Sequence, residues 1–358
     1  INMNITYKGE THSLSNLNEL VNEAPFFESG ITFITDWLSD TDTFNFKSSG
    51  STGAAKTIAI SRNQILKSVS LTENALKLKN TDRALVCLAP EYVATKMMLA
   101  RCLVLNMEII LVDPSSNPLE DLSENEQINF ASFVPMQVQQ MIDSGYSERL
   151  SKINNVLIGG APVFDTLEKK LKSFQNNIYH TYGMTETVSH IALRKLSDGG
   201  DSRYFKCLDG IQITTNADGC LIINGSTTND EQVMTKDLVE IKNENEFIWL
   251  GRQDNLINSG GVKIIPEQIE NLLKPIFKEA EITNEFFIDG IGDSKLGQRL
   301  ILLVEGAPPQ SGFEILMKTN IEKVFSKYHV PKQTIYLEQF IRTTSGKVKR
   351  GETLQLIK

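Results

Sequence analysis

The first half of the chain alternates short apolar runs, rich in β-branched residues, with segments of helical periodicity. The runs at residues 57–60, 84–89, 108–112, 129–134 and 155–158 have the length and composition of buried strands. Such an alternation is typical of an α/β fold, in which helices cover both faces of a largely parallel sheet. We therefore predict a sheet of this kind between residues 31 and 182.

The best-marked helix of this region is predicted at residues 61–78. Ser61 and Gln64 have the spacing of a capping box, in which two side chains exchange hydrogen bonds with backbone N–H groups at a helix start. Ile65, Val69 and Leu76 follow at near-helical spacing, so one face of the helix would pack on the sheet.

Beyond residue 203 the pattern changes to closely spaced short strands, at residues 210–214, 220–223, 238–241 and 246–250. This spacing is typical of a small β-barrel or an antiparallel sheet. A further unit follows, with strands near 285–289 and 300–305 and a helix near 313–325. We expect an N-terminal domain at residues 1–253, with a β-barrel-like subdomain at about 203–250, and a small α+β C-terminal domain at residues 254–358.

Charge and composition limit the class of protein. The 44 acidic residues outnumber the 36 basic ones, and a net charge of −8 argues against nucleic acid as the main partner. The most apolar stretch, residues 97–112, is interrupted by Arg101, Asn106 and Glu108, so membrane insertion is not expected. The cysteines and histidines lack zinc-site spacing. With no basic-then-apolar N-terminal segment, we expect a cytoplasmic protein; a homo-oligomer stays open.

A polar loop lies between two strand-like runs near residue 50. It contains four hydroxyls, two glycines and a lysine: Ser48, Ser49, Gly50, Ser51, Thr52, Gly53 and Lys56. Glycine lets backbone N–H groups approach an anion, the hydroxyls add donors and the lysine adds a positive charge. The glycine spacing differs from that of a Walker loop. We interpret it as a phosphate-binding loop, with a flexible hairpin tip as the alternative.

Three further segments follow in order: His-Thr-Tyr-Gly-Met-Thr-Glu at 180–186, Gly-Arg-Gln-Asp-Asn-Leu-Ile-Asn-Ser-Gly-Gly at 251–261, and Thr-Thr-Ser-Gly-Lys at 343–347. Together with the polar loop, they resemble the ordered signature set of the adenylate-forming acyl-CoA synthetase superfamily. Met184, residues 187–192 and the form of the segment at 254–261 are most similar to the o-succinylbenzoate-CoA ligases of menaquinone biosynthesis. The large N-terminal subdomain of most relatives is mostly absent, so we expect a naturally shortened member.

The resemblance implies the adenylate-forming fold and an AMP-forming acid–thiol ligase that uses ATP, Mg²⁺ and CoA. Such an enzyme activates a small-molecule carboxylate, o-succinylbenzoate in the narrower match, as an acyl-adenylate with release of pyrophosphate. The CoA thiolate then attacks the adenylate and AMP leaves. The alternatives are another aryl- or acyl-CoA ligase of the superfamily, and a relative that binds a nucleotide without catalysis.

The resemblance also assigns roles at the phosphates. The polar loop with Lys56 would hold the β- and γ-phosphates, Thr185 would contact the α-phosphate, and Glu186 would hold Mg²⁺, which prefers oxygen ligands. Candidate members of the acyl pocket are the next residues along the chain: Thr187, Ser189 and His190.

The adenosine would be bound by residues from several segments. The residues implied to line the adenine site are Tyr182, Gly183, Gly160 and Ala161. Asp237 would accept hydrogen bonds from the ribose hydroxyls, with Arg252 assisting at the ribose or phosphate. A turn-capping aspartate and an exposed, ion-paired arginine are the alternatives for these two residues.

The catalytic lysine of the family aligns with Lys347, whose ammonium would bridge the carboxylate and the α-phosphate. The resemblance implies that a mobile C-terminal domain rotates about Asp254 between the two half-reactions. This rotation would present Ser259, Gly260 and Gly261 to the CoA channel. A tight hairpin explains these glycines equally well.

Overall fold

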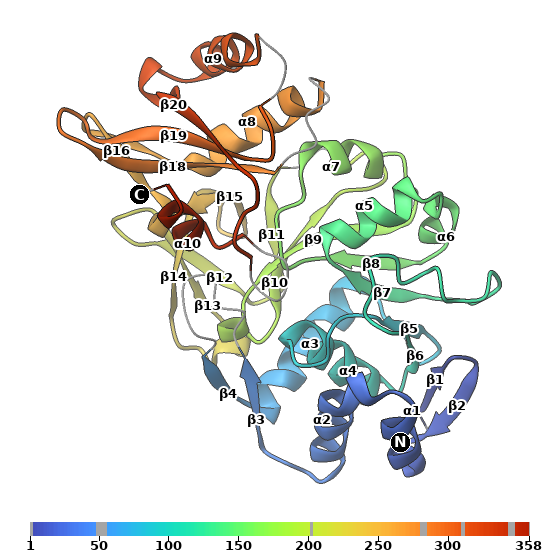
Figure 1. The fold of residues 1–358 in the computed structure, drawn as a ribbon. Coiled ribbons are helices and arrows are strands. Elements are labelled where there is room, and N and C mark those ends of the chain that lie inside the picture. Colours follow the sequence, from blue (N-terminus) through green and yellow to red (C-terminus); the bar gives the residue numbers. More distant parts are fainter. Residues whose placement is uncertain are drawn as a thin grey trace.

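The computed structural model describes residues 3–47, 56–200, 203–279, 285–308, 312–342 and 348–357. They form two lobes, which Figure 1 shows in blue to yellow and in orange to red. A thirteen-stranded sheet runs through the large lobe and a five-stranded sheet through the small lobe. The hairpin of β3 (Thr43–Lys47) and β4 (Thr57–Ser61) forms a separate two-stranded sheet.

The large sheet is mixed, with a parallel section next to an antiparallel one. In spatial order its strands are β12 (Gln212–Thr215), β13 (Cys220–Asn224), β14 (Val233–Asn243), β15 (Glu246–Arg252), β11 (Phe205–Cys207), β10 (His190–Lys195), β9 (Asn177–Gly183), β8 (Asn155–Ile158), β7 (Phe130–Phe133), β5 (Arg83–Val86), β6 (Glu108–Leu111), β1 (Asn4–Tyr7) and β2 (Glu10–Ser13). The run from β1 to β9 is parallel throughout. This confirms the predicted α/β sheet.

Helices cover both faces of the parallel section, because its strands are apolar on both sides. On strand β5, Ala84 and Val86 belong to one core and Leu85 to the other, as a side-chain period of two requires. The first core also contains residues of α2 (Glu28–Leu38), α3 (Arg62–Leu76) and α4 (Val93–Leu105). The second contains residues of α5 (Pro135–Asp143), α6 (Ser147–Ser151) and α7 (Asp165–Leu171).

The start of α3 has the predicted capping box. The Gln64 backbone N–H donates to Ser61 Oγ at 3.2 Å, and the Ser61 N–H donates to Gln64 Oε1 at 3.0 Å. A capping residue of this type stabilises a helix by about 1 kcal/mol. The helix ends at Leu76, followed by Lys77 in the left-handed region. The local sequence therefore determines where this helix begins.

The β-rich region beyond residue 203 is present, with strands close to the predicted ones. It does not close into a barrel in the described part of the chain. Its strands instead continue the large sheet, because β11 pairs with β10 on one side and with β15 on the other. The predicted antiparallel pairing of these strands is confirmed, whereas the predicted closure into a barrel-like subdomain was wrong.

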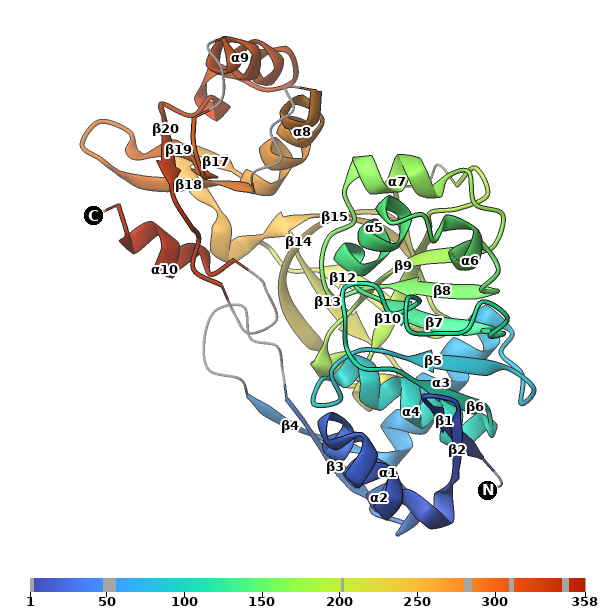
Figure 2. The same cartoon turned by 45° about the vertical axis from the view of Figure 1, so that its right-hand side comes forward.

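The small lobe contains its own sheet and core. Its strands are β16 (Ile257–Ser259), β17 (Val262–Ile264), β18 (Phe286–Asp293), β19 (Gly297–Glu305) and β20 (Gln333–Leu337), and its helices are α8 (Pro266–Glu279), α9 (Phe313–Val324) and α10 (Arg350–Gln355). The 3-10 helix η5 (Gln253–Asn255) connects it to β15. Figure 2 shows α10 beneath the small sheet, on the side nearer the large lobe. The lobes therefore meet in sequence at η5.

The remaining elements lie at the N-terminus and in short turns. They are α1 (Leu17–Glu23), η1 (Leu14–Asn16), η2 (Pro25–Phe27), η3 (Thr185–Thr187), η4 (Ser226–Thr228) and η6 (Lys327–His329). Among the helices that the structure describes, none combines the length and the apolar character needed to cross a bilayer.

Candidate active site

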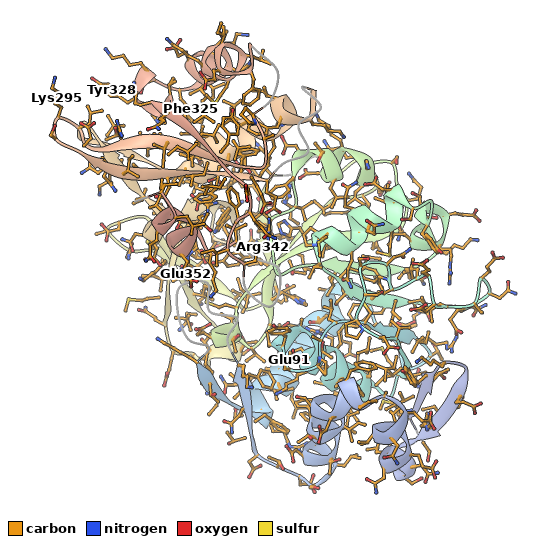
Figure 3. The ribbon with its side chains drawn as sticks, viewed as in Figure 1. Glu91, Lys295, Phe325, Tyr328, Arg342 and Glu352 are labelled. Carbon is orange, nitrogen blue, oxygen red and sulfur yellow. The ribbon has the colours of Figure 1, made fainter. Side chains whose placement is uncertain are left out.

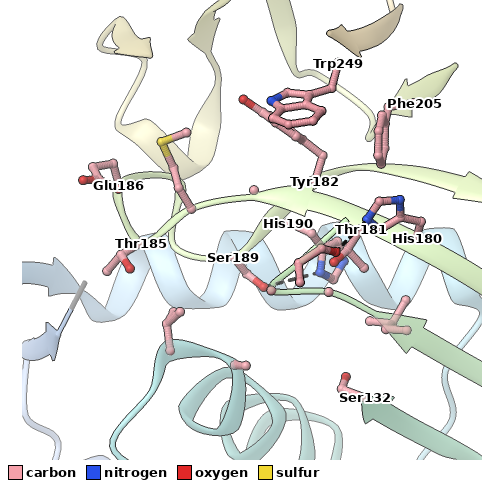
Figure 4. Close-up of a pocket in the computed structure, with 18 of the residues that line it drawn as sticks. Ser132, His180, Thr181, Tyr182, Thr185, Glu186, Ser189, His190, Phe205 and Trp249 are labelled. Carbon is pink, nitrogen blue, oxygen red and sulfur yellow. Dashed lines mark hydrogen bonds between the residues drawn. The ribbon is translucent and has the colours of Figure 1, made fainter. Parts of the chain in front are cut away.

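A cavity of about 980 Å³ opens at the carboxyl ends of β7, β8 and β9. Carboxyl ends of parallel strands meet at one edge of a sheet, where α/β proteins bind their ligands. Figure 4 shows Tyr182, Phe205 and Trp249 on one side of this cavity, here named the aromatic side, and Ser132 on the opposite side. That opposite side also includes Arg101, Ser189 and His190 and is named the arginine side.

The cavity brings together many of the residues predicted from the sequence. Those that line it are Lys56, Gly160, Ala161, Tyr182, Gly183, Thr185, Glu186, Ser189, His190 and Arg252. Those outside the described residues are Ser48, Ser49, Gly50, Ser51, Thr52, Gly53 and Lys347. The described candidates that do not line it are Thr187, Asp237, Asp254, Ser259, Gly260 and Gly261.

Asp237 supports the aromatic side from just behind the cavity wall. Tyr182 Oη donates to Asp237 Oδ2 at 2.7 Å and Trp249 Nε1 donates to Oδ1 at 3.2 Å. Arg252 approaches the same Oδ1 at 3.4 Å. Burial and then the neighbouring carboxylate raise the pKa of Tyr182, so its phenol remains a donor. The carboxylate has room for one more donor on Oδ2, as a ribose anchor requires.

His180 completes this side as a neutral imidazole. Burial first, and then Arg194, lower its pKa to about 3. Its Nε2 lies 3.3 Å from the Ala161 carbonyl oxygen, which requires the Nε2–H tautomer. Phe205 packs against it, with ring centroids 5.0 Å apart. The histidine therefore supports the turn at Gly160, whose φ of 79° suits glycine.

Thr185 and Glu186 lie on the short helix η3 at one end of the cavity. Thr185 is buried, whereas the Glu186 carboxylate is exposed to the cavity. In the described ranges, no cluster of three or more acidic, histidine or cysteine side chains could hold a metal ion by itself. A single carboxylate still suits Mg²⁺, since this ion is usually held by one or two carboxylates together with substrate phosphates. Glu186 therefore fits the predicted metal role.

Thr187 has a structural position and does not reach the cavity. It is fully buried, and its hydroxyl accepts from the Met184 N–H at 3.0 Å and lies 2.8 Å from the Ser189 carbonyl oxygen. This arrangement closes the turn between β9 and β10. Its assignment to the acyl pocket is corrected accordingly, because the hydroxyl is used within the turn.

Arg101 is a site residue that the sequence reasoning did not assign. It lies on α4, only 2% exposed, and lines the cavity. Its Nη2 donates to Thr72 Oγ1 at 3.2 Å and to Ser189 Oγ at 3.0 Å. Burial lowers its pKa to about 10, so it remains a cation at neutral pH. Its signal in the sequence was a lone charge within an apolar helix.

Arg101 has no acidic partner among the described side chains, unlike Arg194, which is also buried. Arg194, for comparison, pairs with both carboxylate oxygens of Glu168, at 3.0 and 2.8 Å. A buried cation without a counter-ion is costly, and such a site favours an anionic ligand. The arginine side can therefore bind a negative group that enters with a ligand.

The connection between the lobes is held by ion pairs. Asp254, on η5, lies 2.7 Å from Lys236 Nζ and 3.2 Å from Arg252 Nη2. Lys236 and Arg252 both line the cavity. The predicted hinge residue is thus tied to two residues of the cavity wall.

Gly260 and Gly261 form the turn of the β16–β17 hairpin, with φ values of 60° and 82°. Two consecutive positive φ angles suit a two-residue hairpin turn and favour glycine at both positions. Gly260 lies beside Tyr328, which Figure 3 places at the end of the small lobe far from the large one. In this arrangement of the lobes the turn is away from the cavity.

The segment that contains Lys347 begins and ends at a pair of described residues. Arg342 and Val348 form an isolated antiparallel bridge, and Arg342 also forms ion pairs with Glu285 and Glu305. Figure 3 shows Arg342 at the edge of the small lobe that faces the large sheet. The two described residues next to positions 343–347 therefore pair with each other, and Arg342 lies on that edge.

Comparison with known proteins agrees with the fold and the cavity. The family model of the AMP-binding enzyme matches residues 39–211. An acyl-CoA synthetase (AMP-forming)/AMP-acid ligase II-like protein from Dyadobacter fermentans is 38% identical, with 93% of this chain and 95% of that one covered and a TM-score of 0.61. This chain belongs to the AMP-binding enzyme family, which confirms the adenylate-forming family predicted from the sequence.

Two more relatives are more distant. A 2-succinylbenzoate–CoA ligase from Bacillus thuringiensis subsp. konkukian is 27% identical, with 86% of this chain and 69% of the relative covered. The solved o-succinylbenzoate CoA synthetase from Bacillus subtilis, in complex with ATP and magnesium ion, is 20% identical, with 87% and 69% covered and a TM-score of 0.73. The structure from Bacillus subtilis shows that the fold is shared. The ligase from Bacillus thuringiensis shows which named enzymes are similar in sequence.

Proposed function

We propose that this protein is an AMP-forming acid–thiol ligase whose substrate is o-succinylbenzoate. In the first half-reaction a carboxylate of the substrate attacks the α-phosphorus of ATP. The bond between the α-phosphorus and the oxygen that bridges to the β-phosphate breaks, and pyrophosphate leaves. In the second, the CoA thiolate attacks the acyl carbon of the adenylate and AMP leaves. Family membership and the named ligases among the relatives support the class.

The observation that carries the choice of substrate is the uncompensated cation of Arg101. o-Succinylbenzoate has two carboxylates, so one can react while the other, on the aromatic ring, stays charged. Two unit charges 4 Å apart at a protein site with an effective dielectric constant of about 20 attract by about 4 kcal/mol. The ring carboxylate would provide the counter-ion that Arg101 lacks among the described residues, where its hydrogen-bond partners are the neutral side chains of Thr72 and Ser189.

The aromatic side would bind adenosine. The ring would lie against Tyr182 and Trp249, above the small residues at Gly160 and Ala161. The ribose hydroxyls would donate to Asp237, with Arg252 close by. Since Asp237 is already held by two neutral donors, its position is fixed before the nucleotide enters.

The phosphate chemistry would take place near η3. Thr185 would donate to the α-phosphate, while the polar loop and Lys56 would hold the β- and γ-phosphates. Bound Mg²⁺ would neutralise charge on the phosphate oxygens, with Glu186 as its protein ligand. Lys347 would bring a positive charge to the carboxylate and α-phosphate oxygens in the transition state.

We also propose that the lobes act as two domains, at residues 1–253 and 254–358, with Asp254 as the hinge. Rotation would withdraw Lys347 after adenylation and bring Ser259, Gly260 and Gly261 to the CoA channel. Support comes from the separate cores of the two lobes and from the distant position of the glycine turn.

The test is a panel of carboxylates scored for pyrophosphate release, and for AMP release with and without CoA. We expect turnover with o-succinylbenzoate and much weaker turnover with 4-oxo-4-phenylbutanoate, which lacks the ring carboxylate. Turnover of benzoates or fatty acids, without o-succinylbenzoate, would overturn the substrate and retain the class. ATP binding without adenylate from any acid would overturn both.

A further inference from the structure

Behind the arginine side, a closed hydrogen-bond ring joins α3, α4 and the start of β10. Thr72 Oγ1 lies 3.1 Å from His190 Nε2 and 3.2 Å from Arg101 Nη2. Ser189 Oγ lies 3.0 Å from the same Nη2 and 3.4 Å from His190 Nδ1. Figure 4 shows Ser189 and His190 together beneath β9. Two side chains, Thr72 and Ser189, thus meet at one guanidinium nitrogen, and His190 joins these two to each other.

The protons of this ring can be assigned one by one. Thr72 donates its single hydroxyl proton to the Ser68 carbonyl oxygen at 3.0 Å, so Thr72 Oγ1 can only accept from its other two partners. His190 must then carry its proton on Nε2. Burial, followed by the charge of Arg101, lowers the pKa of His190 well below its ordinary value, so Nδ1 is free of a proton. Ser189 therefore donates to Nδ1.

The ring uses both protons of one terminal nitrogen of the arginine, Nη2, and leaves the other terminal nitrogen, Nη1, for a ligand. Both protons of Nη2 are used, on Thr72 and Ser189. Nε of Arg101 is buried and has no hydrogen-bond partner in the described part of the chain. A guanidinium has five N–H donors, and within the described part of the chain no hydrogen bond uses the two on Nη1, whose position is fixed by the bonds of Nη2.

The backbone beneath Ser189 and His190 is strained to keep them there. Val188 is fully buried and has a φ of 69°, a value that is strained for a β-branched residue. Gly183 packs so closely that a Cβ would lie 2.2 Å from the Ser189 carbonyl oxygen and 2.5 Å from His190 Cα. Strain of this kind persists where surrounding structure demands a particular orientation.

We propose that Thr72 is a positioning residue, which through its bonds to Arg101 and His190 aims the guanidinium at the second carboxylate of the substrate. It thereby sets the preference of the site for a dicarboxylate over a monocarboxylate. Thr72 is fully buried outside the cavity lining, and its hydroxyl is used by Ser68, His190 and Arg101, so it has no hydrogen bond left for a substrate or a nucleotide. The inference rests on the proposed function, because it presupposes that Arg101 binds a substrate carboxylate.

The experiment compares Thr72→Val, which keeps the shape and removes the hydroxyl, with Thr72→Ser, which keeps the hydroxyl. Adenylation is followed by pyrophosphate release with o-succinylbenzoate and with 4-oxo-4-phenylbutanoate. We expect Thr72→Val to lower the ratio of the two kcat/KM values about tenfold, which corresponds to about 1.4 kcal/mol, mainly through KM for the dicarboxylate, because the guanidinium loses one of the two acceptors that orient it. Thr72→Ser should restore the ratio.

The outcomes separate the two proposals. If the wild-type protein does not prefer the dicarboxylate, the proposed substrate and this inference both fall. If the wild type prefers it and Thr72→Val keeps the same ratio, only the positioning role falls. Equal loss with both acids, or no recovery in Thr72→Ser, would show that Thr72 acts in packing alone.

A second measurement holds even if Thr72→Val does not fold. Nitrogen-15 NMR of histidine-labelled wild-type protein, with His190→Gln to assign the signal, should show a neutral ring with its proton on Nε2 between pH 6 and 8. A proton on Nδ1, or titration of the ring in this range, would contradict the hydrogen-bond ring and overturn the inference.

Discussion

The aromatic and arginine sides of the cavity differ in whether their buried charged residue has a partner of opposite charge among the described residues. On the aromatic side, the Asp237 carboxylate receives hydrogen bonds from Tyr182 and Trp249 and is approached by Arg252. On the arginine side, Arg101 donates only to the neutral hydroxyl oxygens of Thr72 and Ser189 among the described residues. The negative charge of Asp237 is thus compensated by Arg252, whereas the positive charge of Arg101 has no counter-ion among the described residues.

This difference has a consequence for recognition. In the proposed function, a satisfied anchor such as Asp237 would bind any ligand with the right hydroxyl groups, because its contacts with Tyr182 and Trp249 fix its geometry without a ligand. An unsatisfied cation such as Arg101 discriminates, because a ligand without an anion leaves it desolvated and unpaired. The nucleotide would thus be bound by pre-formed geometry and the acid selected by charge.

The largest effect is expected from Lys347, which would act on atoms contributed by both sides. We expect Lys347→Ala to slow adenylation about 10²- to 10³-fold, the usual cost of removing one group that stabilises charge in a transition state. Thioester formation from supplied acyl-adenylate should change little. Pyrophosphate exchange and single-turnover CoA transfer measure the two steps separately, and equal loss in both would contradict the assigned role.

The next largest effect is expected when the charge of the arginine side is removed. Arg101→Leu should lower kcat/KM for o-succinylbenzoate about tenfold to a hundredfold, because the ring carboxylate loses its charged partner. The KM for ATP should stay close to that of the wild type. Arg101→Lys is the matched control, since it keeps the charge and loses the planar geometry. An unchanged kcat/KM in Arg101→Leu would remove the contrast between the two sides.

Much of this arrangement could be predicted from the sequence, because it depends on local signals. The strand Asn155–Ile158 has its predicted bounds, and α3 begins at the predicted capping box. Closure of the β-rich region was predicted wrongly, because the same short strands and turns fit a barrel or a sheet extension. The choice depends on the pairing of β11 with β15, which is a contact distant in sequence.

The site shows the same division. The segment 180–186 could be assigned to the cavity from its residues, whereas Arg101 could not. An arginine in an apolar helix ordinarily extends its charge to water along a flexible stem. Only the fold brings Ser189 and Thr72 to it, across 88 and 29 positions of sequence. Thr187 is the opposite case, because it was predicted to line the acyl pocket and its hydroxyl instead bonds within the turn between β9 and β10.

A moderate effect is expected on the aromatic side. Asp237→Asn should raise the KM for ATP about tenfold, because an amide oxygen is a weaker acceptor for ribose hydroxyls than a carboxylate. The ratio of activities with dicarboxylate and monocarboxylate should stay the same. Steady-state kinetics with varied ATP provide the measurement. A changed ratio would show that the two sides are coupled, which would contradict separate recognition of the nucleotide and the acid.

The smallest effect is expected at the hinge. Lys236→Met removes one of the two cations on Asp254 and leaves Arg252 in place. Lys236 is 59% exposed in its side chain, and exposed ion pairs contribute about 0–1 kcal/mol. We expect about a twofold change in the ratio of thioester formation to adenylation, with little change in melting temperature. A loss of adenylation beyond about tenfold would instead place Lys236 at the nucleotide, and the aromatic side would then include an uncompensated cation of its own.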